Sequence, residues 1–241
     1  MLLKMAEDIE KLKYKIDYDF NNKALLREAL THRSFAVENN LPYDNQRLEF
    51  LGDAVLQILL TEFLFLRYTE EDEGSMTKMR SAMVQQEALA KVARKLELGK
   101  FIFAGKGELE SGGDDRDSTL SDLFEAFVGA YYLDAGFAKV RDFINALMSS
   151  EFPEPDKLLA GLNPKGTLQE YTQKKWGITP EYEILSVTGP DHNPSYLVGV
   201  IVNDKVKAEG IASSRKQAES QAARNALIQL AESDQALNGI F

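Results

Sequence analysis

The sequence predicts two domains, the first built from helices alone and the second a mixed α+β domain with the element order α-β-β-β-α. Three observations support this division. Apolar residues recur at helical spacing through residues 24–149. Pro153 and Pro155 then interrupt helical structure. Beyond these prolines, apolar and polar residues alternate as they do in strands that bury one face.

The first domain is expected to contain five helices, separated by segments rich in polar residues and glycine. Ser118 suits the N-cap of the fourth helix, and Gly136 lies where that helix should stop. The glycines and acids of residues 105–116 indicate a long exposed loop. That loop lacks the Walker pattern, so it is not expected to bind a nucleotide phosphate. The five expected helices cover residues 24–31, 47–68, 75–96, 119–133 and 139–149.

The second domain is expected to start with a helix and to end with one. Asn203 and Asp204 are typical of the tight turn of a β-hairpin. The expected helices cover residues 165–175 and 214–231, and the expected strands cover residues 181–188, 196–203 and 206–211. The predicted domain limits are residues 1–152 for the first domain, 153–162 for a linker, 163–232 for the second domain and 233–241 for a C-terminal tail.

The composition narrows the class of protein. The 241 residues include no cysteine, which excludes disulfides and a thiolate metal site. Residues 1–16 mix charged with apolar side chains, so they lack the continuous apolar core of a signal peptide. No uncharged apolar stretch reaches the roughly 18 residues that a membrane-spanning helix needs. We therefore expect a soluble, cytoplasmic protein that does not bind a membrane.

The net charge of −10 would oppose binding to a polyanion if it were spread evenly. It is not evenly spread. Residues 1–155 hold 19 Lys and Arg against 28 Asp and Glu, whereas the remaining residues hold 9 against 10. The acidity therefore belongs mostly to the first domain, where bound cations would offset part of it.

Two acids lie in a strongly apolar segment of the first domain. Residues 47–66 read RLEFLGDAVLQILLTEFLFL, which predicts a helix that is apolar on nearly every face and therefore buried. Glu49 and Asp53 are spaced i,i+4, so they project from one face of this helix. A buried carboxylate is normally paired or bound to a metal. No Lys or Arg follows at helical spacing, because the next position on that face is Gln57.

The same pattern recurs in the fourth helix, where Asp122 and Glu125 share a face at i,i+3. If the two helices pack together, four carboxylates converge. Two like charges about 4 Å apart repel by about 4 kcal/mol at an effective dielectric constant near 20, so the group would need divalent cations to stay ionised. Oxygen ligands favour Mg²⁺ or Mn²⁺. The alternative is a pair of surface helices whose acids lie in solvent.

These acidic segments resemble those of a known enzyme family. Residues 46–56, QRLEFLGDAVL, and 117–126, DSTLSDLFEA, are similar to the two acidic signatures of ribonuclease III, an endonuclease that cuts double-stranded RNA. Residues 30–34 (LTHRS) and 105–108 (GKGE) also match family landmarks. The resemblance implies an all-α ribonuclease III-like endonuclease domain. It implies that Glu49, Asp53, Asp122 and Glu125 ligate catalytic Mg²⁺, for which Mn²⁺ can substitute, with Asp53 and Glu125 as catalytic residues and no organic cofactor.

Three further residues of the first domain have open roles. Glu73 matches another family carboxylate near the cleavage site, but it also belongs to the acidic run of residues 70–73, which solvent could simply hydrate. Gln46 stands where many relatives carry Glu, so it keeps the hydrogen-bonding capacity and loses the charge. His32, near an expected helix end, could act as a catalyst, although a structural hydrogen bond is the preferred interpretation.

The second domain resembles the double-stranded-RNA-binding domain. The likeness implies that the first helix and the loop at residues 189–192 face RNA minor grooves, while the start of the last helix contacts phosphates. A-form RNA is read through its shape, 2′-hydroxyls and phosphates, and the N-terminus of a helix favours an anion. The RNA-binding residues implied in this way are Thr167, Gln169, Glu170, His192, Ser214, Arg215 and Lys216.

The predicted function is therefore Mg²⁺-dependent cleavage of double-stranded RNA to 5′-phosphate and 3′-hydroxyl ends with short 3′ overhangs, in the processing of ribosomal and other structured RNAs. The family resemblance also implies a homodimer. Apolar residues support it independently, because Phe63, Phe65 and a group on the fourth helix (Phe124, Phe127, Val128 and Tyr131) are expected to offer surface for a two-fold interface. The alternatives are a non-catalytic RNA-binding protein and a phosphohydrolase acting on small nucleotides.

Overall fold

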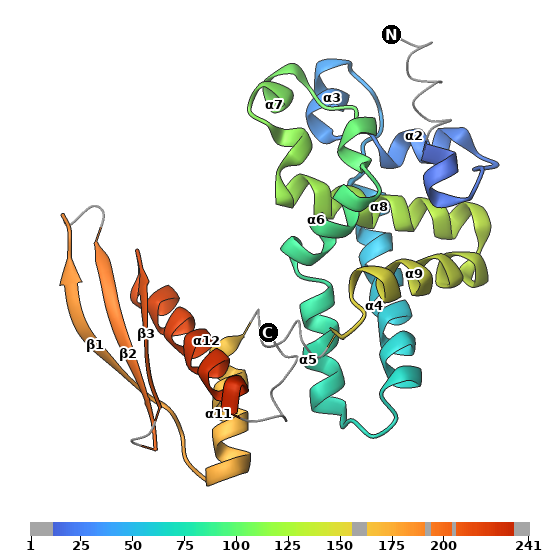
Figure 1. The fold of residues 1–241 in the computed structure, drawn as a ribbon. Helices are drawn as coiled ribbons and strands as arrows, with labels where there is room; N and C mark the ends of the chain where they lie inside the picture. The colour runs from blue at the N-terminus through green and yellow to red at the C-terminus, as the bar shows by residue number, and fades with distance from the viewer. Residues whose placement is uncertain (1–11, 156–162, 191–193, 204–205, 234–241) are drawn as a thin grey trace. The chain divides into compact units, whose positions relative to one another are not determined.

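The computed structural model describes residues 12–155, 163–190, 194–203 and 206–233. It confirms the predicted fold class, a helical domain followed by an α-β-β-β-α domain (Figure 1). The chain divides into two compact units between Pro153 and Glu154. Within the described parts, no helix is long and apolar enough to cross a membrane.

The first unit is helical throughout its described part. Residues 12–16 are helical. The α-helices that follow are α2 (Lys23–Ala29), α3 (Arg33–Glu38), α4 (Gln46–Arg67), α5 (Glu73–Met83), α6 (Gln86–Lys95), α7 (Lys106–Glu110), α8 (Asp117–Ala135) and α9 (Phe137–Glu151), and the 3₁₀ helices are η1 (Leu98–Phe101) and η2 (Gly113–Asp115).

Three expectations about these helices were wrong. The single helix expected at residues 75–96 is two helices, because Gln85 takes an extended conformation that turns the chain and lets α6 pack on α8. The loop expected at residues 105–116 contains α7 and η2, which are too short to show a periodic pattern. The N-cap of α8 is Arg116 instead of Ser118. Gly136 does end α8, with a backbone φ of 81°.

The centre of the first unit is the crossing of α4 and α8, which Figure 1 shows near the middle of this unit. Helix α8 also contacts α2, α6 and α9, so most of its residues between Thr119 and Tyr131 are buried. The apolar group predicted as a dimer surface is consequently buried: Phe63, Phe124, Phe127, Val128 and Tyr131 are all in the core, and only Phe65 is exposed. That prediction was wrong because it assigned core-filling side chains of α8 to the surface.

Helix α4 was expected to be buried on every face, and this too was wrong. One face packs on α8 through residues such as Leu56, Leu59 and Leu60, which are fully buried. The opposite face is exposed along a stripe at helical spacing, formed by Phe50, Ala54, Ile58, Thr61 and Phe65. We call these five residues the α4 stripe.

The second unit is a three-stranded antiparallel sheet with its helices packed against one face (Figure 1). Val198, Val200 and Val202 point from the middle strand into the core. An ideal Cβ at Gly210 would lie only 2.3 Å from the backbone oxygen of Ala218, so the last helix lies directly on the sheet. The elements are α11 (Pro164–Trp176), β1 (Glu181–Thr188), β2 (Ser195–Val202), β3 (Val206–Ala212) and α12 (Arg215–Ser233).

Candidate active site

Two glycines bring the acidic segments of α4 and α8 together. An ideal Cβ at Gly52 would lie 1.8 Å from the backbone oxygen of Glu125, and one at Gly129 would lie 2.3 Å from the backbone oxygen of Leu48. The two helix backbones therefore touch, at a separation that no side chain would permit. The sequence analysis assigned these glycines no role. Their position inside predicted helices was a signal of close packing, because glycine inside a helix costs about 1 kcal/mol relative to alanine.

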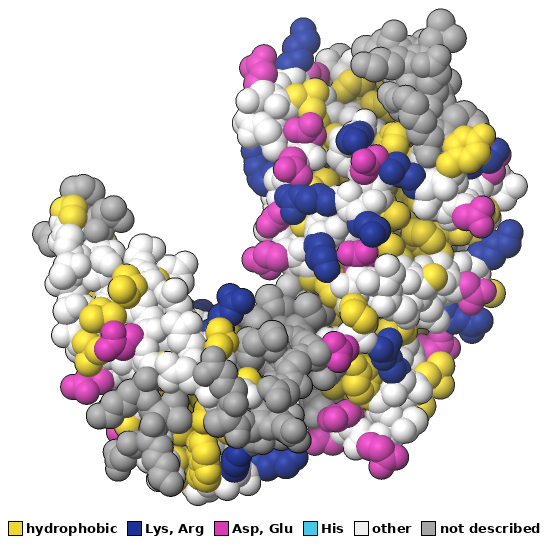
Figure 2. All heavy atoms as spheres, in the orientation of Figure 1, with side chains coloured by type: hydrophobic (Ala, Val, Ile, Leu, Met, Phe, Trp, Pro, Cys, Tyr) yellow, Lys and Arg dark blue, Asp and Glu magenta, His cyan; other side chains and the backbone are white. Residues whose placement is uncertain are grey.

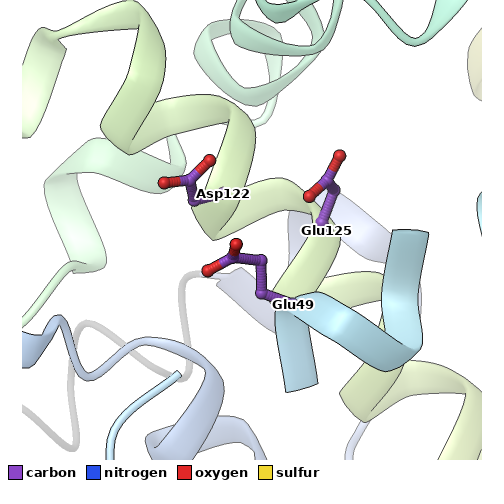
Figure 3. A group of neighbouring side chains, drawn as sticks. All are labelled: Glu49, Asp122 and Glu125. Atoms are coloured by element: carbon purple, nitrogen blue, oxygen red, sulfur yellow. The ribbon is translucent and has the colours of Figure 1, made fainter. Parts of the chain in front are cut away.

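The crossing gathers three of the four predicted metal ligands. Glu49 from α4 and Asp122 and Glu125 from α8 each offer a carboxylate oxygen, and these atoms lie within 4.8 Å of one another. Figure 3 shows the three side chains converging on one space between the helices. Asp53 lies outside this group of three, one helical turn after Glu49 on an exposed part of α4, where its Oδ1 accepts a hydrogen bond from Gln57 Nε2 at 3.3 Å.

The convergence of like charges changes the protonation of the group. Burial raises the pKa of Glu125 from its ordinary 4.5 to about 8, and the charges of Asp53, Asp122 and Glu49 act in the same direction. Burial also raises the pKa of Glu49, with contributions from Asp122 and Asp44. Glu125 therefore holds a proton at neutral pH unless positive charge is brought to the cluster.

In the described ranges, none of the four carboxylates forms an ion pair with Lys or Arg. Basic side chains form ion pairs in other parts of the domain, such as those of Arg94 with Asp115 and Asp117. Over the face shown in Figure 2, Lys and Arg are interspersed with acids. An all-oxygen group that lacks a cationic partner fits a hard divalent ion.

His32 has a structural role beside the cluster. It lies just after α2 ends, as the sequence suggested, and it is also the N-cap of α3. Its Nδ1 lies 2.8 Å from Ser34 Oγ and accepts a hydrogen bond from the Ser34 backbone N–H, and Ser34 Oγ in turn accepts one from Gly105 N–H at 2.8 Å. The preferred interpretation, a structural hydrogen bond, agrees with these contacts.

The pKa of Asp122 is raised by burial, while a hydrogen bond from Ser121 and the charge of His32 act in the opposite direction.

The other two residues with open roles lie apart from the cluster. Glu73 is the first residue of α5 and accepts a hydrogen bond from Thr77 Oγ1 at 3.1 Å. It follows the far end of α4, about 25 Å along the helix axis from Glu49, so within one chain it is not part of the acidic group. Gln46 is exposed in the first turn of α4, where it lines a surface pocket together with Phe50 and Leu133.

The predicted RNA-binding residues of the second unit lie on exposed helix segments. Gln169 and Glu170 are exposed on α11, beside a partly buried Thr167. Arg215 and Lys216 are exposed in the first turn of α12. Ser214 caps that helix, because its Oγ accepts a hydrogen bond from the Gln217 backbone N–H at 3.3 Å. His192 lies outside the described residues.

Comparisons with known proteins match each unit to a protein family. Residues 22–151 match the family model described as Ribonuclease-III-like, and residues 164–230 match the double-stranded RNA binding motif. The chain belongs to the ribonuclease III family. Ribonuclease 3 of Campylobacter curvus is 42% identical over 221 residues, covering 92% of this chain and 97% of that protein. Ribonuclease 3 of Wolinella succinogenes is 43% identical over 221 residues, covering 92% and 91%.

Solved structures are consistent with this family assignment. The nuclease domain of ribonuclease III from Campylobacter jejuni is 43% identical and superposes with a TM-score of 0.57, covering 60% of this chain and 99% of that domain. The Campylobacter jejuni domain shows structural flexibility in a region involved in its dimer formation. Family membership makes this chain an endoribonuclease that cleaves double-stranded RNA, with a C-terminal domain that binds it.

Proposed function

We propose that this ribonuclease cleaves double-stranded RNA with Mg²⁺, or Mn²⁺ in its place, held by Glu49, Asp53, Asp122 and Glu125. The observation that carries this proposal is the convergence of carboxylates that have no cationic partner in the described residues, where the pKa of Glu125 is raised to about 8. Such a group is unfavourable by itself and becomes favourable when a divalent cation binds.

A bound divalent cation supplies an activated water nucleophile and stabilises negative charge on the leaving 3′ oxygen. The residues of this chain fix where that happens. The rigid crossing at Gly52 and Gly129 holds the ligands from α4 against those from α8. We assign the catalytic roles to Asp53 and Glu125, and we propose Glu73 and Gln46 as additional active-site residues.

The proposed products have 5′-phosphate and 3′-hydroxyl ends with short 3′ overhangs. The proposed substrates are duplex segments of ribosomal RNA precursors and of other structured transcripts, including messenger and transfer RNA precursors, cut in the cytoplasm. We propose that residues 1–152 form the catalytic and dimerisation domain and residues 163–232 the RNA-binding domain, joined by the linker at residues 153–162. Thr167, Gln169, Glu170, His192, Ser214, Arg215 and Lys216 are proposed to contact the RNA.

We propose that the protein acts as a homodimer through the α4 stripe. Phe50 is 82% exposed and Phe65 is 65% exposed, which is costly for aromatic side chains in water. The stripe runs almost the length of α4, and a two-fold interface would cover it with the same stripe from a second copy. The pocket lined by Gln46 and Leu133 lies beside Phe50 and offers about 630 Å³ for an apolar side chain.

Cleavage of a long RNA duplex in Mg²⁺ or in EDTA tests the proposed chemistry. We expect cutting in Mg²⁺ and none in EDTA. The variant Glu125→Gln should lose cleavage by at least about 100-fold, because it removes a proposed ligand, while duplex binding in Ca²⁺ is retained. Glu62→Gln is the matched control, since Glu62 lies on α4 near Arg141 and away from the cluster.

Each outcome separates the alternatives. A non-catalytic RNA-binding protein would bind the duplex without cutting it in any metal. A small-nucleotide phosphohydrolase would release phosphate from nucleotides and leave the duplex intact. Cleavage by Glu125→Gln at the wild-type rate would contradict the assignment of Glu125 to the site.

A further inference from the structure

Glu219 joins the two helices of the RNA-binding domain through one carboxylate. It lies in the second turn of α12 and is only 9% exposed. Its Oε1 accepts a hydrogen bond from Arg215 Nε at 2.8 Å, and its Oε2 accepts one from Lys165 Nζ of α11. The same side chain thus contacts the first turns of both helices that carry proposed RNA-binding residues.

The contact with Arg215 leaves the outer part of the guanidinium available. Glu219 engages the inner nitrogen, Nε, and the two Nη groups have no partner among the described residues. The Arg215 side chain is 61% exposed. A guanidinium held by Nε in this way presents its remaining four N–H donors outward, in the planar geometry that matches a phosphate.

Lys165 is held from a second side. Its Nζ lies 4.5 Å from the centroid of the Tyr182 ring, which is a cation–π distance. Tyr182 belongs to β1, so the sheet also fixes the position of Lys165. Hydrogen bonds from Lys165 and Arg215 lower the pKa of Glu219, although burial opposes them, so the carboxylate is ionised at neutral pH.

Helix stability alone does not explain this arrangement. Arginine in the first turn of a helix is disfavoured by the helix dipole. Arginine followed by glutamate at i+4 is also the less favourable order for a helical ion pair. Arg215 nevertheless lies in the first turn of α12, where the buried Glu219 orients it. Binding of an external anion would explain why a cation stands there.

We propose that Glu219 is a positioning residue that holds the guanidinium of Arg215 and the ammonium of Lys165 in place for the phosphates of duplex RNA, so that α11 and α12 grip the duplex as one unit. This inference rests on the proposed RNA contacts of the second domain. Lys165 and Glu219 extend the set of residues on which that binding depends.

The test uses the sign of the effect of Glu219→Gln on affinity for duplex RNA, measured with the full-length protein across a salt series in Ca²⁺. Removing a negative charge near a polyanion should tighten binding if Glu219 acts only through its charge. Loss of positioning should instead weaken binding, by about 5-fold, and lower the slope of log K against log salt by up to about one unit. We expect the weakening.

The controls separate position from charge. Glu209→Gln removes an equal charge from an exposed residue of β3 and should leave binding unchanged or slightly tighter. Glu219→Gln should add little to a variant that carries both Arg215→Ala and Lys165→Ala, because both residues to be positioned are then gone. Arg215→Lys keeps the charge and loses the Nε contact together with the outward N–H groups, so it should weaken binding to a similar degree even if Glu219→Gln does not fold.

Tighter or unchanged binding by a folded Glu219→Gln would overturn the inference, as would unchanged binding by Arg215→Lys. Either result leaves the proposed RNA contacts standing if the wild type prefers duplex RNA to duplex DNA. Equal affinity of the wild type for both duplexes would instead contradict the proposed role of the whole domain.

Discussion

The two domains place buried carboxylates in opposite electrostatic surroundings. Glu125 of the nuclease domain faces three other acids and no cation in the described residues, and its pKa is raised to about 8. Glu219 of the RNA-binding domain faces two cations, and its pKa is lowered. The first group is complete only when a cation from solution binds. The second group pairs its carboxylate with cations of the protein itself, and we propose that it presents those cations to a polyanion.

This contrast also explains how an acidic protein can act on RNA. The sequence carries a net charge of −10, and the excess of acids lies in residues 1–155. Part of that excess is the acidic cluster, which bound metal would neutralise. In our proposal, phosphate binding depends on local cations such as Arg215 and Lys216, and the net charge of the chain says little about it.

Gly52→Ala should have the largest effect, because it forces apart the two helices on which the acidic cluster depends. A Cβ at this position would lie 1.8 Å from a backbone oxygen of α8, which cannot move as a flexible side chain can. We expect a loss of about 3 kcal/mol in the free energy of unfolding, together with loss of RNA cleavage. Calorimetric unfolding and the duplex cleavage assay measure these two effects.

Gly107→Ala is the control for that substitution. Gly107 lies in α7, and a Cβ there would meet nothing within 4 Å. We expect stability and cleavage to remain at wild-type levels or slightly above. A stable and active Gly52→Ala protein would show that the two helices can separate without disturbing the cluster, and it would break the link between the crossing and the site.

Glu219→Gln should have a smaller effect on stability. The direction of that effect follows from the lowered pKa of Glu219. Because the pKa of Glu219 is lowered in the folded protein, its contribution is complete above the ordinary pKa of 4.5 and is lost as pH falls through the lower folded value. The variant should therefore be less stable than wild type by about 1 kcal/mol at pH 7. Calorimetry below pH 4 should find the two proteins more nearly equal.

The sequence predicted the fold class, and it named the three carboxylates that the structure brings together, Glu49, Asp122 and Glu125, because both follow from local patterns. Periodicity located α4 and α8, and the i,i+4 and i,i+3 spacing of the acids placed each pair on one face. Sequence patterns failed to predict the features that depend on tertiary packing. The burial of Phe124 and Phe127 depends on how many helices surround α8, and the split between α5 and α6 depends on one extended residue, Gln85.

The contact partners of the candidate site were the least predictable part. The role of Gly52 depends on the distance between two helices that are far apart in sequence. The pairing of Glu219 with Lys165 joins residues 54 positions apart. Its pairing with Arg215 at i,i+4 was a local signal that could have been found.

The acidic cluster is expected to be unfavourable until a divalent cation binds, and this is the property on which the proposed chemistry depends. The most direct test is the free energy of unfolding of the wild type and of Glu125→Gln, measured by calorimetry in EDTA between pH 5 and pH 8.5 and then repeated in Mg²⁺. The folded pKa of Glu125 is raised from 4.5 to about 8. Ionisation therefore costs the metal-free folded protein stability as pH rises through that window.

In EDTA at pH 8.5 we predict that Glu125→Gln is more stable than the wild type by about 2 kcal/mol, a value reduced by the partial exposure of the site to solvent. The difference should shrink toward pH 5, where the wild-type carboxyl is protonated. Mg²⁺ should stabilise the wild type much more than the variant. A Glu125→Gln protein that is equally or less stable than wild type at pH 8.5 in EDTA would contradict the claim.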